Sequence, residues 1–421
     1  AATSRPQVMG NIDCRGKPIP AVGRALIEHY NAASPGERYM ARLDAYPPGL
    51  RIWLLEAGAR HHAEAALDDK GGWWLTIQRG ASPAQGSIPG VHHLLSAGDM
   101  IWAARRDSRI VRIDAGSGKV AASAEVAVKA SHLALGAGAH TLFIADAGDD
   151  RVIALRASDL AVEHAWPAPG MPQLPVAAPD GIVCVTGGAS GTLTIARPFG
   201  GRYAEQTINV GRAPHDPLLA ADAAHVFVPC AGDGEIVKVR LIDGRIVGRC
   251  AVGDGPAHLA LHPDGTRIYS ANSWDGTLTC ITTDGERVGS AASGGWAHAI
   301  ETTPDGRWVY VANFLDDTLA VFDARTLQRV ALLQTEAYAH GLDISPDGRY
   351  VIATGFSSGH LRLYDARAHS EIARIEVGLG SSHSVFLNGE DTAFVGCSVS
   401  DHVACVDLAA RRCVKRLRLD A

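Results

Sequence analysis

Short apolar runs separated by polar turns fill the chain from about residue 87 to its end. The three most regular copies of this pattern start at Ala257, Ala297 and Ala339. Each copy has an apolar run, a Pro-Asp-Gly turn and three further apolar runs divided by polar residues. Pro-Asp-Gly suits a tight turn, because proline fixes φ, aspartate caps the turn and glycine accepts a positive φ. The pattern therefore predicts units of four short strands.

Weaker copies extend this pattern over the whole tract. Equivalent first-strand positions recur every 39 to 43 residues, at 93, 132, 173, 215, 258, 298, 340 and 383. Four strands in a unit of about 40 residues are typical of a β-propeller blade. We expect a mainly β protein with an eight-bladed β-propeller, and seven blades are the alternative. The last copy contains all four of its strands, so the sequence leaves open how the ring closes.

A different pattern precedes the propeller. Strand-like runs at 11–16, 37–45, 60–67 and 73–78 alternate with segments of helical spacing at 18–33 and 50–57. The order β-α-β-α-β-β predicts a small two-layer α/β sandwich. The chain then divides into four parts: an N-terminal tail (1–8), an α/β domain (9–80), a linker (81–86) and the propeller (87–421).

Histidine recurs at the start of the first strand of each copy. Seven of the eight copies carry it, and the third copy carries Gln173 instead. The seven residues are His93, His132, His215, His258, His298, His340 and His383. The first strand of a blade lines the central channel, so these imidazoles should meet around one axis. Imidazole commonly binds copper, zinc, iron and nickel, and we predict a transition metal or metallocofactor in the channel.

Positions at the ends of the second strands add further candidate ligands. They include Asp146, Cys230 and Cys397, and the two cysteines lie four blades apart. Thiolates suit copper or iron, so we predict these three residues and Gln173 as additional ligands. Histidines that only line a solvent-filled channel are the alternative, because duplication of a repeat copies whatever residue its ancestor carried.

Composition narrows the remaining function classes. Lys and Arg number 39 against 45 Asp and Glu, a net charge of −6, which disfavours binding to a nucleic-acid backbone. The sequence contains no run of 18 apolar residues, so it predicts no membrane-spanning helix. Eight cysteines in 421 residues are too few for a disulfide framework. Several lie in apolar runs, as buried thiols of a reducing compartment do, so we expect the cytoplasm, with the periplasm as the alternative. A bridge between Cys405 and Cys413 also stays open.

The α/β domain resembles the TusA family of small sulfur-carrier proteins. The resemblance rests on Ile12-Asp13-x-Arg15-Gly16, Pro-x-Pro at 18–20, the Pro-Gly-Glu turn at 35–37 and Trp-Leu-x-Ile at 74–77. In that family a cysteine before the first proline carries a persulfide at a helix N-terminus, where the dipole favours a thiolate. Lys17 stands at that position here, and Cys14 is the sulfur-carrier candidate. A docking domain for a protein partner is the alternative.

The repeats resemble the YVTN family of propellers, with Tyr-Val-Ala-Asn at 310–313 nearest its name motif. The blade count, Tyr-Ala-His at 338–340 and Asp-Gly-Arg-Tyr at 347–350 also resemble the heme d1 domain of dissimilatory nitrite reductase and its relatives. That resemblance implies a haem d1-like cofactor with His340 as axial ligand and His215, His258 or His298 as distal donors.

Three functions follow from these patterns. We place a haem d1-like cofactor first. A multinuclear copper site, as in nitrous oxide reductase, is second, since one ion takes only four to six ligands. A metal-free scaffold for protein partners is third. An enzyme of this kind would be an oxidoreductase acting on a small molecule. We expect Arg105, Arg106 and Arg109 to form an exposed turn, and pairing with porphyrin carboxylates is the alternative.

Overall fold

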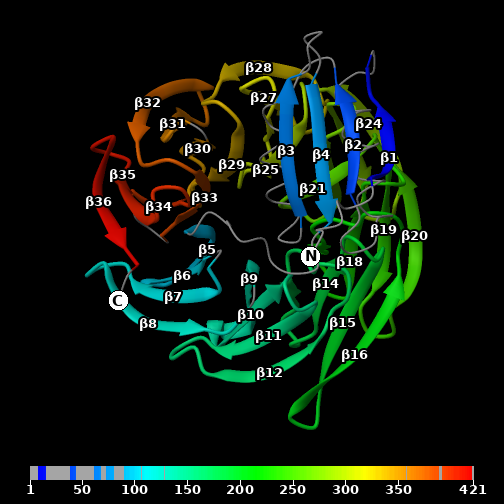
Figure 1. Cartoon of the computed structure of the whole chain (residues 1–421). Coiled ribbons are helices and arrows are strands. Elements are labelled where there is room, and N and C mark those ends of the chain that lie inside the picture. Colours follow the sequence, from blue (N-terminus) through cyan, green and yellow to red (C-terminus); the bar gives the residue numbers. More distant parts are fainter. Residues whose placement is uncertain are drawn as a thin grey trace, which may run out of the picture. The chain divides into compact units, whose positions relative to one another are not determined.

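The computed structural model describes residues 8–15, 38–43, 61–67, 73–79, 90–105, 107–127, 129–356, 358–387 and 391–419. The chain forms two compact units, Ala1–Ser87 and Ile88–Ala421. Figure 1 shows the strands of both units. Among the described residues, no helix is long and apolar enough to cross a membrane.

The N-terminal unit contains one four-stranded sheet, ordered β1-β2-β4-β3. Its strands are β1 (Val8–Asp13), β2 (Arg38–Leu43), β3 (His61–Leu67) and β4 (Trp73–Arg79). β1 runs parallel to β2, whereas β4 runs antiparallel to both β2 and β3. The strands predicted at 37–45, 60–67 and 73–78 are confirmed, and the strand expected at 11–16 lies earlier, at Val8–Asp13. Both segments predicted as helices lie outside the described residues, so the second layer of the sandwich stays a prediction.

The second unit is a propeller of eight four-stranded antiparallel sheets. Eight blades are therefore confirmed, and the seven-bladed alternative is wrong. Blade 1 comprises β5 (Val91–Ala97), β6 (Met100–Arg105), β7 (Arg109–Asp114) and β8 (Lys119–Glu125). Blade 2 comprises β9 (Ala130–Leu135), β10 (Thr141–Asp146), β11 (Arg151–Arg156) and β12 (Val162–Pro167), with a short 3-10 turn, η1, at Ala137–Ala139.

Blades 3 to 5 continue the same order from the channel outward. Blade 3 comprises β13 (Val176–Ala177), β14 (Val183–Gly187), β15 (Thr192–Phe199) and β16 (Arg202–Asn209). Blade 4 comprises β17 (Leu218–Leu219), β18 (His225–Cys230), β19 (Glu235–Arg240) and β20 (Arg245–Ala251). Blade 5 comprises β21 (Pro256–Leu261), β22 (Arg267–Asn272), β23 (Thr277–Thr282) and β24 (Arg287–Ala292).

The last three blades complete the ring. Blade 6 comprises β25 (Ala297–Thr302), β26 (Trp308–Asn313), β27 (Thr318–Asp323) and β28 (Arg329–Gln334). Blade 7 comprises β29 (Ala339–Ile344), β30 (Tyr350–Gly355), β31 (His360–Asp365) and β32 (Ser370–Glu376). Blade 8 comprises β33 (Ser381–Phe386), β34 (Thr392–Cys397), β35 (His402–Asp407) and β36 (Arg412–Arg418).

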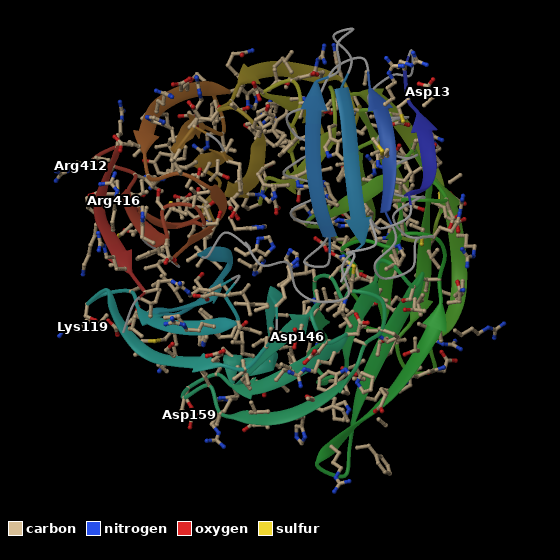
Figure 2. All side chains as sticks on the ribbon, in the orientation of Figure 1. Asp13, Lys119, Asp146, Asp159, Arg412 and Arg416 are labelled. Atoms are coloured by element: carbon tan, nitrogen blue, oxygen red, sulfur yellow. The ribbon has the colours of Figure 1, made fainter. Side chains whose placement is uncertain are left out.

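The core lies between neighbouring blades, and the apolar pattern of each strand explains its place. The second strands are apolar on both faces and buried almost throughout, as β26 illustrates with only Trp308 partly exposed. The outermost strands alternate, so every second residue of β8 faces solvent. Figure 2 shows Lys119, Arg412 and Arg416 at the outer rim. Burial of two faces of the middle strands holds each blade against the next.

Blade 8 closes on blade 1 by side-chain packing rather than by an exchanged strand. Leu94 and Val111 pack in one apolar cluster with Phe394 and Leu417. The buried guanidinium of Arg105 donates to Asp107 and to Asp401, with Nη1 2.7 Å from Asp401 Oδ1. The expectation of an exposed turn is wrong for Arg105, because its carboxylate partner comes from the opposite end of the tract. Removing one member of a buried ion pair is costly, so this pair fixes the seam.

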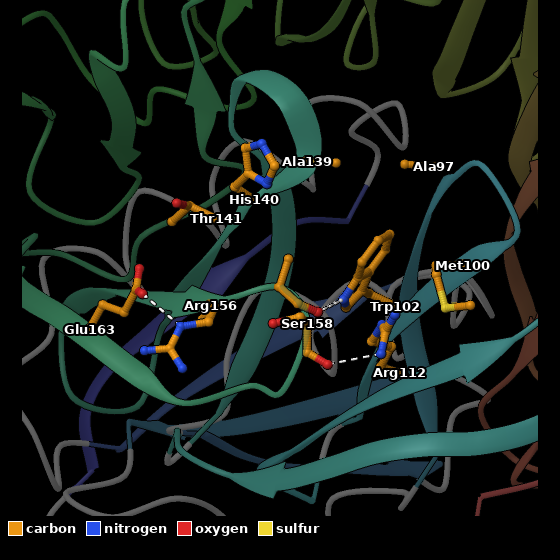
Figure 3. Close-up of a pocket in the computed structure, with 11 residues that line it drawn as sticks. Ala97, Met100, Trp102, Arg112, Ala139, His140, Thr141, Arg156, Ser158 and Glu163 are labelled. Atoms are coloured by element: carbon orange, nitrogen blue, oxygen red, sulfur yellow. Dashed lines mark hydrogen bonds and ion pairs between the residues drawn. The ribbon is translucent and has the colours of Figure 1, made fainter.

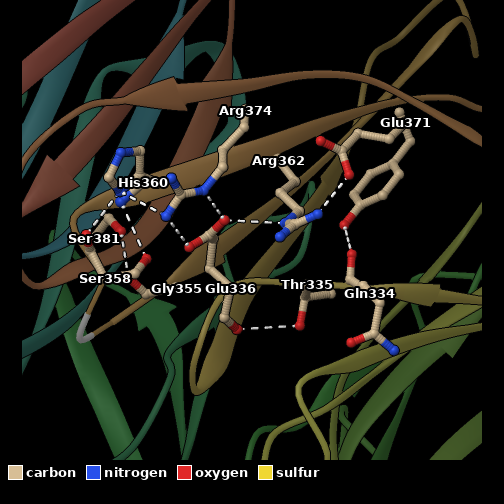
Figure 4. Close-up of polar contacts among 11 residues, drawn as sticks. Gln334, Thr335, Glu336, Gly355, Ser358, His360, Arg362, Glu371, Arg374 and Ser381 are labelled. Carbon is tan, nitrogen blue, oxygen red and sulfur yellow. Dashed lines mark hydrogen bonds and ion pairs between the residues drawn. The ribbon is translucent and has the colours of Figure 1, made fainter.

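A buried carboxylate anchors the loop that leads into β29. Glu336 is 4% exposed and accepts hydrogen bonds from Arg362 Nε at 3.0 Å and from Arg374 Nε at 2.6 Å. Figure 4 shows this network, with His360 beside Arg374. Although burial opposes ionisation, the hydrogen bond from Arg374 is the larger effect and holds the pKa of Glu336 at about 2. The loop before His340 is therefore held in one position.

Candidate metal centre in the propeller channel

A β-bulge marks the start of the inner strand in every blade. In blade 5, Pro256 pairs with Asn272 but His258 pairs with Ala271, so β21 holds one extra residue. The same offset occurs in β5, β9, β25, β29 and β33. In blades 3 and 4 a bridge at Pro172 or Pro214 gives the same offset before the short inner strand. A bulge re-aims side chains, and these bulges lie at the predicted histidine positions.

The seven predicted histidines do come together. From His215 the imidazoles run in order around the channel, and mostly meet edge to face. Successive ring centroids lie 4.9, 4.5, 5.1, 5.2, 4.9 and 5.1 Å apart through His215, His258, His298, His340, His383, His93 and His132. The run is interrupted at blade 3, where Gln173 occupies the eighth position.

The imidazoles are held in the neutral form that metals require. Burial, with the neighbouring imidazoles, lowers the pKa of His93 to about 3, and burial lowers that of His258 to about 3 although Asp216 opposes the shift. The pKa values of His298 and His383 are also well below the ordinary value, for the same two reasons. Crowded cations would repel one another, so these four imidazoles are neutral at pH 7.

Asp216 brings a carboxylate to the interrupted side of the ring. Its Oδ1 lies 3.5 Å from His215 Nδ1, and its Oδ2 lies 3.4 Å from His258 Nδ1. The backbone N–H of Leu174 donates to the same carboxylate at 3.4 Å. Burial raises the pKa of Asp216, but the surrounding imidazoles and this N–H outweigh it and bring the pKa to about 2. Asp216 is therefore an anion at pH 7, beside the neutral imidazole of His258.

These three side chains form the tightest group of metal-ligating atoms. One ligand atom each from His215, Asp216 and His258 lies within 4.8 Å of the others, and no second such trio occurs among the described residues. The Nε2 atom of His258 is buried without a hydrogen-bond partner. Two imidazoles and one carboxylate with open positions are the ligand set of many non-haem iron sites.

The predicted cysteine and aspartate ligands lie elsewhere. Cys230 and Cys397 are fully buried within apolar clusters between blades, and their thiols approach the carbonyl oxygens of Val210 and Val377. Burial raises the pKa of each thiol to about 12, so neither is a thiolate at pH 7. Asp146 accepts hydrogen bonds from the backbone of Lys129 and from the side chain of Arg151. Their geometry is that of structural residues.

Cysteines outside the channel are also accounted for. No disulfide joins Cys405 and Cys413, so the bridge that the sequence left open is not formed. Cys14 follows β1 and is 1% exposed, and its backbone N–H donates to Arg42 at 2.9 Å. A carrier thiol must reach its donor and acceptor, so this burial does not suit sulfur transfer.

Sequence reasoning missed two channel residues, His92 and Asp216. The imidazole of His92 lies 5.1 Å from that of His132 and 5.7 Å from that of His383. Both residues depart from the repeat: the position before the ring histidine is otherwise Ala, Ser or Pro, and the position after it is otherwise Leu, Ala, Gly or Ser. A departure from the repeat was the signal that could have identified them.

Two carboxyl groups lie on the inner strands beyond the ring. Glu301 follows His298 by three residues on β25, and Asp343 follows His340 by three on β29. Ser384 donates a hydrogen bond to Asp343. Burial raises the pKa of Asp343 to about 7, and the surrounding protein and Asp343 raise that of Glu301 to about 8, although its side chain is exposed to the channel. The channel therefore carries acidic groups at two levels.

A pocket of about 520 Å³ lies away from this ring, at the seam of blades 1 and 2 (Figure 3). Its arginines are engaged, since Arg112 donates to Ser158 O at 2.8 Å and Arg156 pairs with Asp159 and Glu163. Trp102 closes its floor and donates to Ala157 O at 3.0 Å. The contacts are those of a blade seam.

Comparisons with known proteins agree with the propeller architecture. A family described as "Lactonase, 7-bladed beta-propeller" matches residues 201–370, which is less than half of the chain. Among curated proteins, none matches the chain in sequence.

Several solved propellers are similar in fold. Dihydro-heme d1 dehydrogenase NirN, solved with DHE, is 17% identical with a TM-score of 0.58, over 76% of this chain and 71% of that one. Kuenenia stuttgartiensis hydrazine synthase is 17% identical with a TM-score of 0.55, over 66% and 94%. Saccharomyces cerevisiae Sqt1 is 10% identical with a TM-score of 0.66, over 74% and 94%. Identities this low show the fold alone, so these comparisons support the β-propeller architecture of the chain.

Proposed function

We propose that the propeller binds a transition-metal ion in its central channel and uses it in redox chemistry on a small molecule. The observation that carries the proposal is the convergence of His215, Asp216 and His258. Their protonation states are those of ligands at pH 7, because the carboxylate of Asp216 is ionised and His258 is neutral.

The charge of the channel favours a metal cation. Glu301 and Asp343 lie on the inner strands, and Asp216 lies just before one of them. The eight inner strands contain no Lys or Arg. The ionised carboxylate of Asp216 attracts a divalent ion by charge, whereas the raised pKa values of Glu301 and Asp343 keep part of those carboxyl groups protonated at pH 7.

A haem d1-like tetrapyrrole is the second candidate, because a dihydro-heme d1 dehydrogenase is among the similar folds. His340 would be its axial ligand. Its carboxylates would need cations, which the inner strands lack, and Arg105 is held by Asp107 and Asp401. The residues of the channel therefore fit a bare ion better than a tetrapyrrole. A multinuclear copper site remains compatible with the number of imidazoles.

Two ligand nitrogens and one carboxylate leave coordination positions for a small substrate. A metal held in this way can act as a Lewis acid or exchange electrons with a bound molecule. The chain's own contribution is to keep imidazoles such as that of His258 neutral and to orient them by the bulges.

Titration with Co²⁺ tests the proposal, because its visible absorption reports bound imidazole and carboxylate. The variant is His258→Gln, since Gln173 shows that a ring position accepts glutamine. We expect wild-type protein to bind Co²⁺ and the variant to lose at least about 90% of its affinity, as loss of a metal ligand should. His164→Ala, on the outer strand β12, is the control and should bind as wild type.

Equal Co²⁺ affinity in wild-type and His258→Gln protein would overturn the proposed site. Failure of the purified protein to bind Co²⁺, Zn²⁺, Cu²⁺ or Fe²⁺ would favour the metal-free scaffold. If the protein bound haem but no bare ion, and if substitution of His340 abolished haem binding, the tetrapyrrole would be favoured.

A further inference from the structure

His92 departs from the repeat in a way that creates a second cluster of imidazoles. The seven equivalent residues of the other repeats are Ser131, Pro172, Pro214, Ala257, Ala297, Ala339 and Ser382. None of these side chains is an imidazole, and only in blade 1 do two histidines stand together at the bulge. His92 is 7% exposed and lies between the histidines of the two neighbouring blades.

Four imidazoles gather at this point from blades 8, 1 and 2. The ring centroid of His92 lies 5.1 Å from that of His132 and 5.7 Å from that of His383. His93 lies 5.1 and 4.9 Å from the same two rings, and these two are 6.1 Å apart. Five pairs of ring centroids in this cluster are therefore 4.9 to 6.1 Å apart. In the rest of the imidazole ring, only histidines of successive blades are this close.

The five ring-centroid distances are close to those of histidines around one ion, although the ligand atoms of these residues do not lie within 4.8 Å of one another as those of His215, Asp216 and His258 do. A bond of about 2.0–2.1 Å between metal and nitrogen places the ring centres of tetrahedral ligands roughly 5 Å apart. The rings now meet edge to face, and the nitrogens do not all point to one centre. The torsion about Cβ–Cγ of histidine is broad, so each ring turns at low cost.

We infer that His92, His93, His132 and His383 form a second metal site in the channel, one that takes Zn²⁺ or Cu²⁺. The inference rests on the proposed function and deepens it, since it adds a second ion to the first, and its ligands are four residues other than His215, Asp216 and His258. All four proposed ligands are imidazoles, and the carboxylate of Asp216 acts on His93 and His132 through its charge. Imidazole suits Zn²⁺ and Cu²⁺ better than Mg²⁺, Ca²⁺ or Mn²⁺, which prefer oxygen.

Buried atoms of this cluster support a ligand. The Nε2 atom of His383 is buried without a hydrogen-bond partner. His93 Nδ1 accepts only a long bond, 3.4 Å, from the backbone N–H of Leu133. A bound cation would satisfy the nitrogen lone pairs that the channel leaves unused.

The test is the stoichiometry of Zn²⁺ in the full-length protein, measured by titration calorimetry and by elemental analysis after desalting. We expect two ions per chain in wild type. His92→Ala restores the residue type of the other repeats, so the blade should fold, and His383→Gln follows Gln173. Each variant should bind one of the two Zn²⁺ ions at least about tenfold more weakly, as expected when a metal ligand is lost.

Matched variants separate this site from the first. His258→Gln should remove the other ion and leave the His92 site filled, and the double variant His258→Gln/His92→Ala should bind neither. His164→Ala is the control and should keep both. Circular dichroism and the unfolding midpoint of each metal-free variant check that the propeller is intact.

The outcomes are distinguishable. One ion per chain, lost in His258→Gln and unaffected in His92→Ala and His383→Gln, overturns the second site and keeps the first. One ion lost in all three variants means a single shared centre and also overturns the second site. Two ions in every variant would contradict both sites.

Discussion

The two sides of the imidazole ring differ in the group that stands beside the histidines. On the side of blades 4 and 5, the carboxylate of Asp216 lies 3.5 Å from His215 and 3.4 Å from His258. On the side of blades 8, 1 and 2, a fourth imidazole, His92, stands where other repeats have small residues. The two sides therefore offer different candidate ligands, and each difference lies in one residue at a bulge that departs from the other repeats.

Lowering the pH should have the largest effect, because it destabilises the imidazoles on both sides of the ring. In the unfolded chain each imidazole takes up a proton near pH 6.5, whereas the pKa of His93 and His258 falls to about 3 in the fold and that of His298 and His383 also lies well below 6.5. Below pH 6.5 the unfolded chain therefore binds more protons than the folded chain does, so the free energy of unfolding decreases as the pH is lowered.

The raised pKa values of Glu301 and Asp343 act in the opposite direction. Their folded carboxyls keep protons that the unfolded chain releases above about pH 4, so they add stability as the pH falls from 8. The effect of the four imidazoles exceeds that of the two carboxyl groups, because the side chain of Glu301 is exposed. We therefore expect the free energy of unfolding to decrease by roughly 2–4 kcal/mol between pH 6.5 and pH 5. Urea unfolding of metal-free protein measures it, and a flat pH profile would contradict neutral, crowded imidazoles.

Asp216→Asn should separate the two sides most strongly. The substitution keeps the shape and removes the charge, so Zn²⁺ affinity on the Asp216 side should fall about 100-fold. The His92 side should be unchanged in the same calorimetric titration. Asp222→Asn is the control, since Asp222 pairs with His225 on an exposed turn. Equal losses on both sides would mean that the two ligand sets are not independent.

The two sides should also differ in the metal that they prefer, with Mn²⁺ affinity about tenfold higher on the Asp216 side than on the His92 side. Mn²⁺ prefers carboxylate oxygen, whereas an all-imidazole set favours Cu²⁺ and Zn²⁺. We therefore expect one Mn²⁺ per chain, bound on the Asp216 side, and two Zn²⁺. Electron paramagnetic resonance counts bound Mn²⁺ directly. Two equally tight Mn²⁺ ions would show that the difference in ligands has no chemical consequence.

Gln173→His should have the smallest effect. It completes the eighth ring position next to Leu174, whose N–H donates to Asp216. An extra imidazole should tighten Zn²⁺ on the Asp216 side by a few-fold, roughly two- to tenfold, and leave the His92 side alone. Gln206→His, on the outer strand β16, is the matched control. A change on the His92 side would contradict the assignment of Gln173 to the opposite side.

The repeat made the fold and the ring predictable, because both follow from features that eight copies share. Pro-Asp-Gly turns and apolar runs predicted the strands, and seven histidines at one repeat position predicted the imidazole ring. The four strands of the N-terminal sheet followed from their apolar alternation in the same way. The TusA-like identity of that unit stays a prediction.

The residues that the sequence misassigned depend on contacts across the tract. Cys230 and Cys397 end their strands beside the bulge, and the strand pairing turns them into the core between blades. Arg105 meets Asp401 from a blade at the other end of the sequence. His92 and Asp216 were missed because they differ from the repeat, and shared positions alone were taken as the signal. In a repeat protein, the exceptions to the repeat also deserve to be weighed as ligands.

Anomalous diffraction from crystals grown with Zn²⁺, recorded on both sides of the zinc absorption edge, tests the proposed metal binding in the channel most directly. We expect two anomalous peaks inside the ring. One should lie among His215, Asp216 and His258, and the other among His92, His93, His132 and His383. A saturated crystal whose channel shows no anomalous peak would contradict the proposed metal binding.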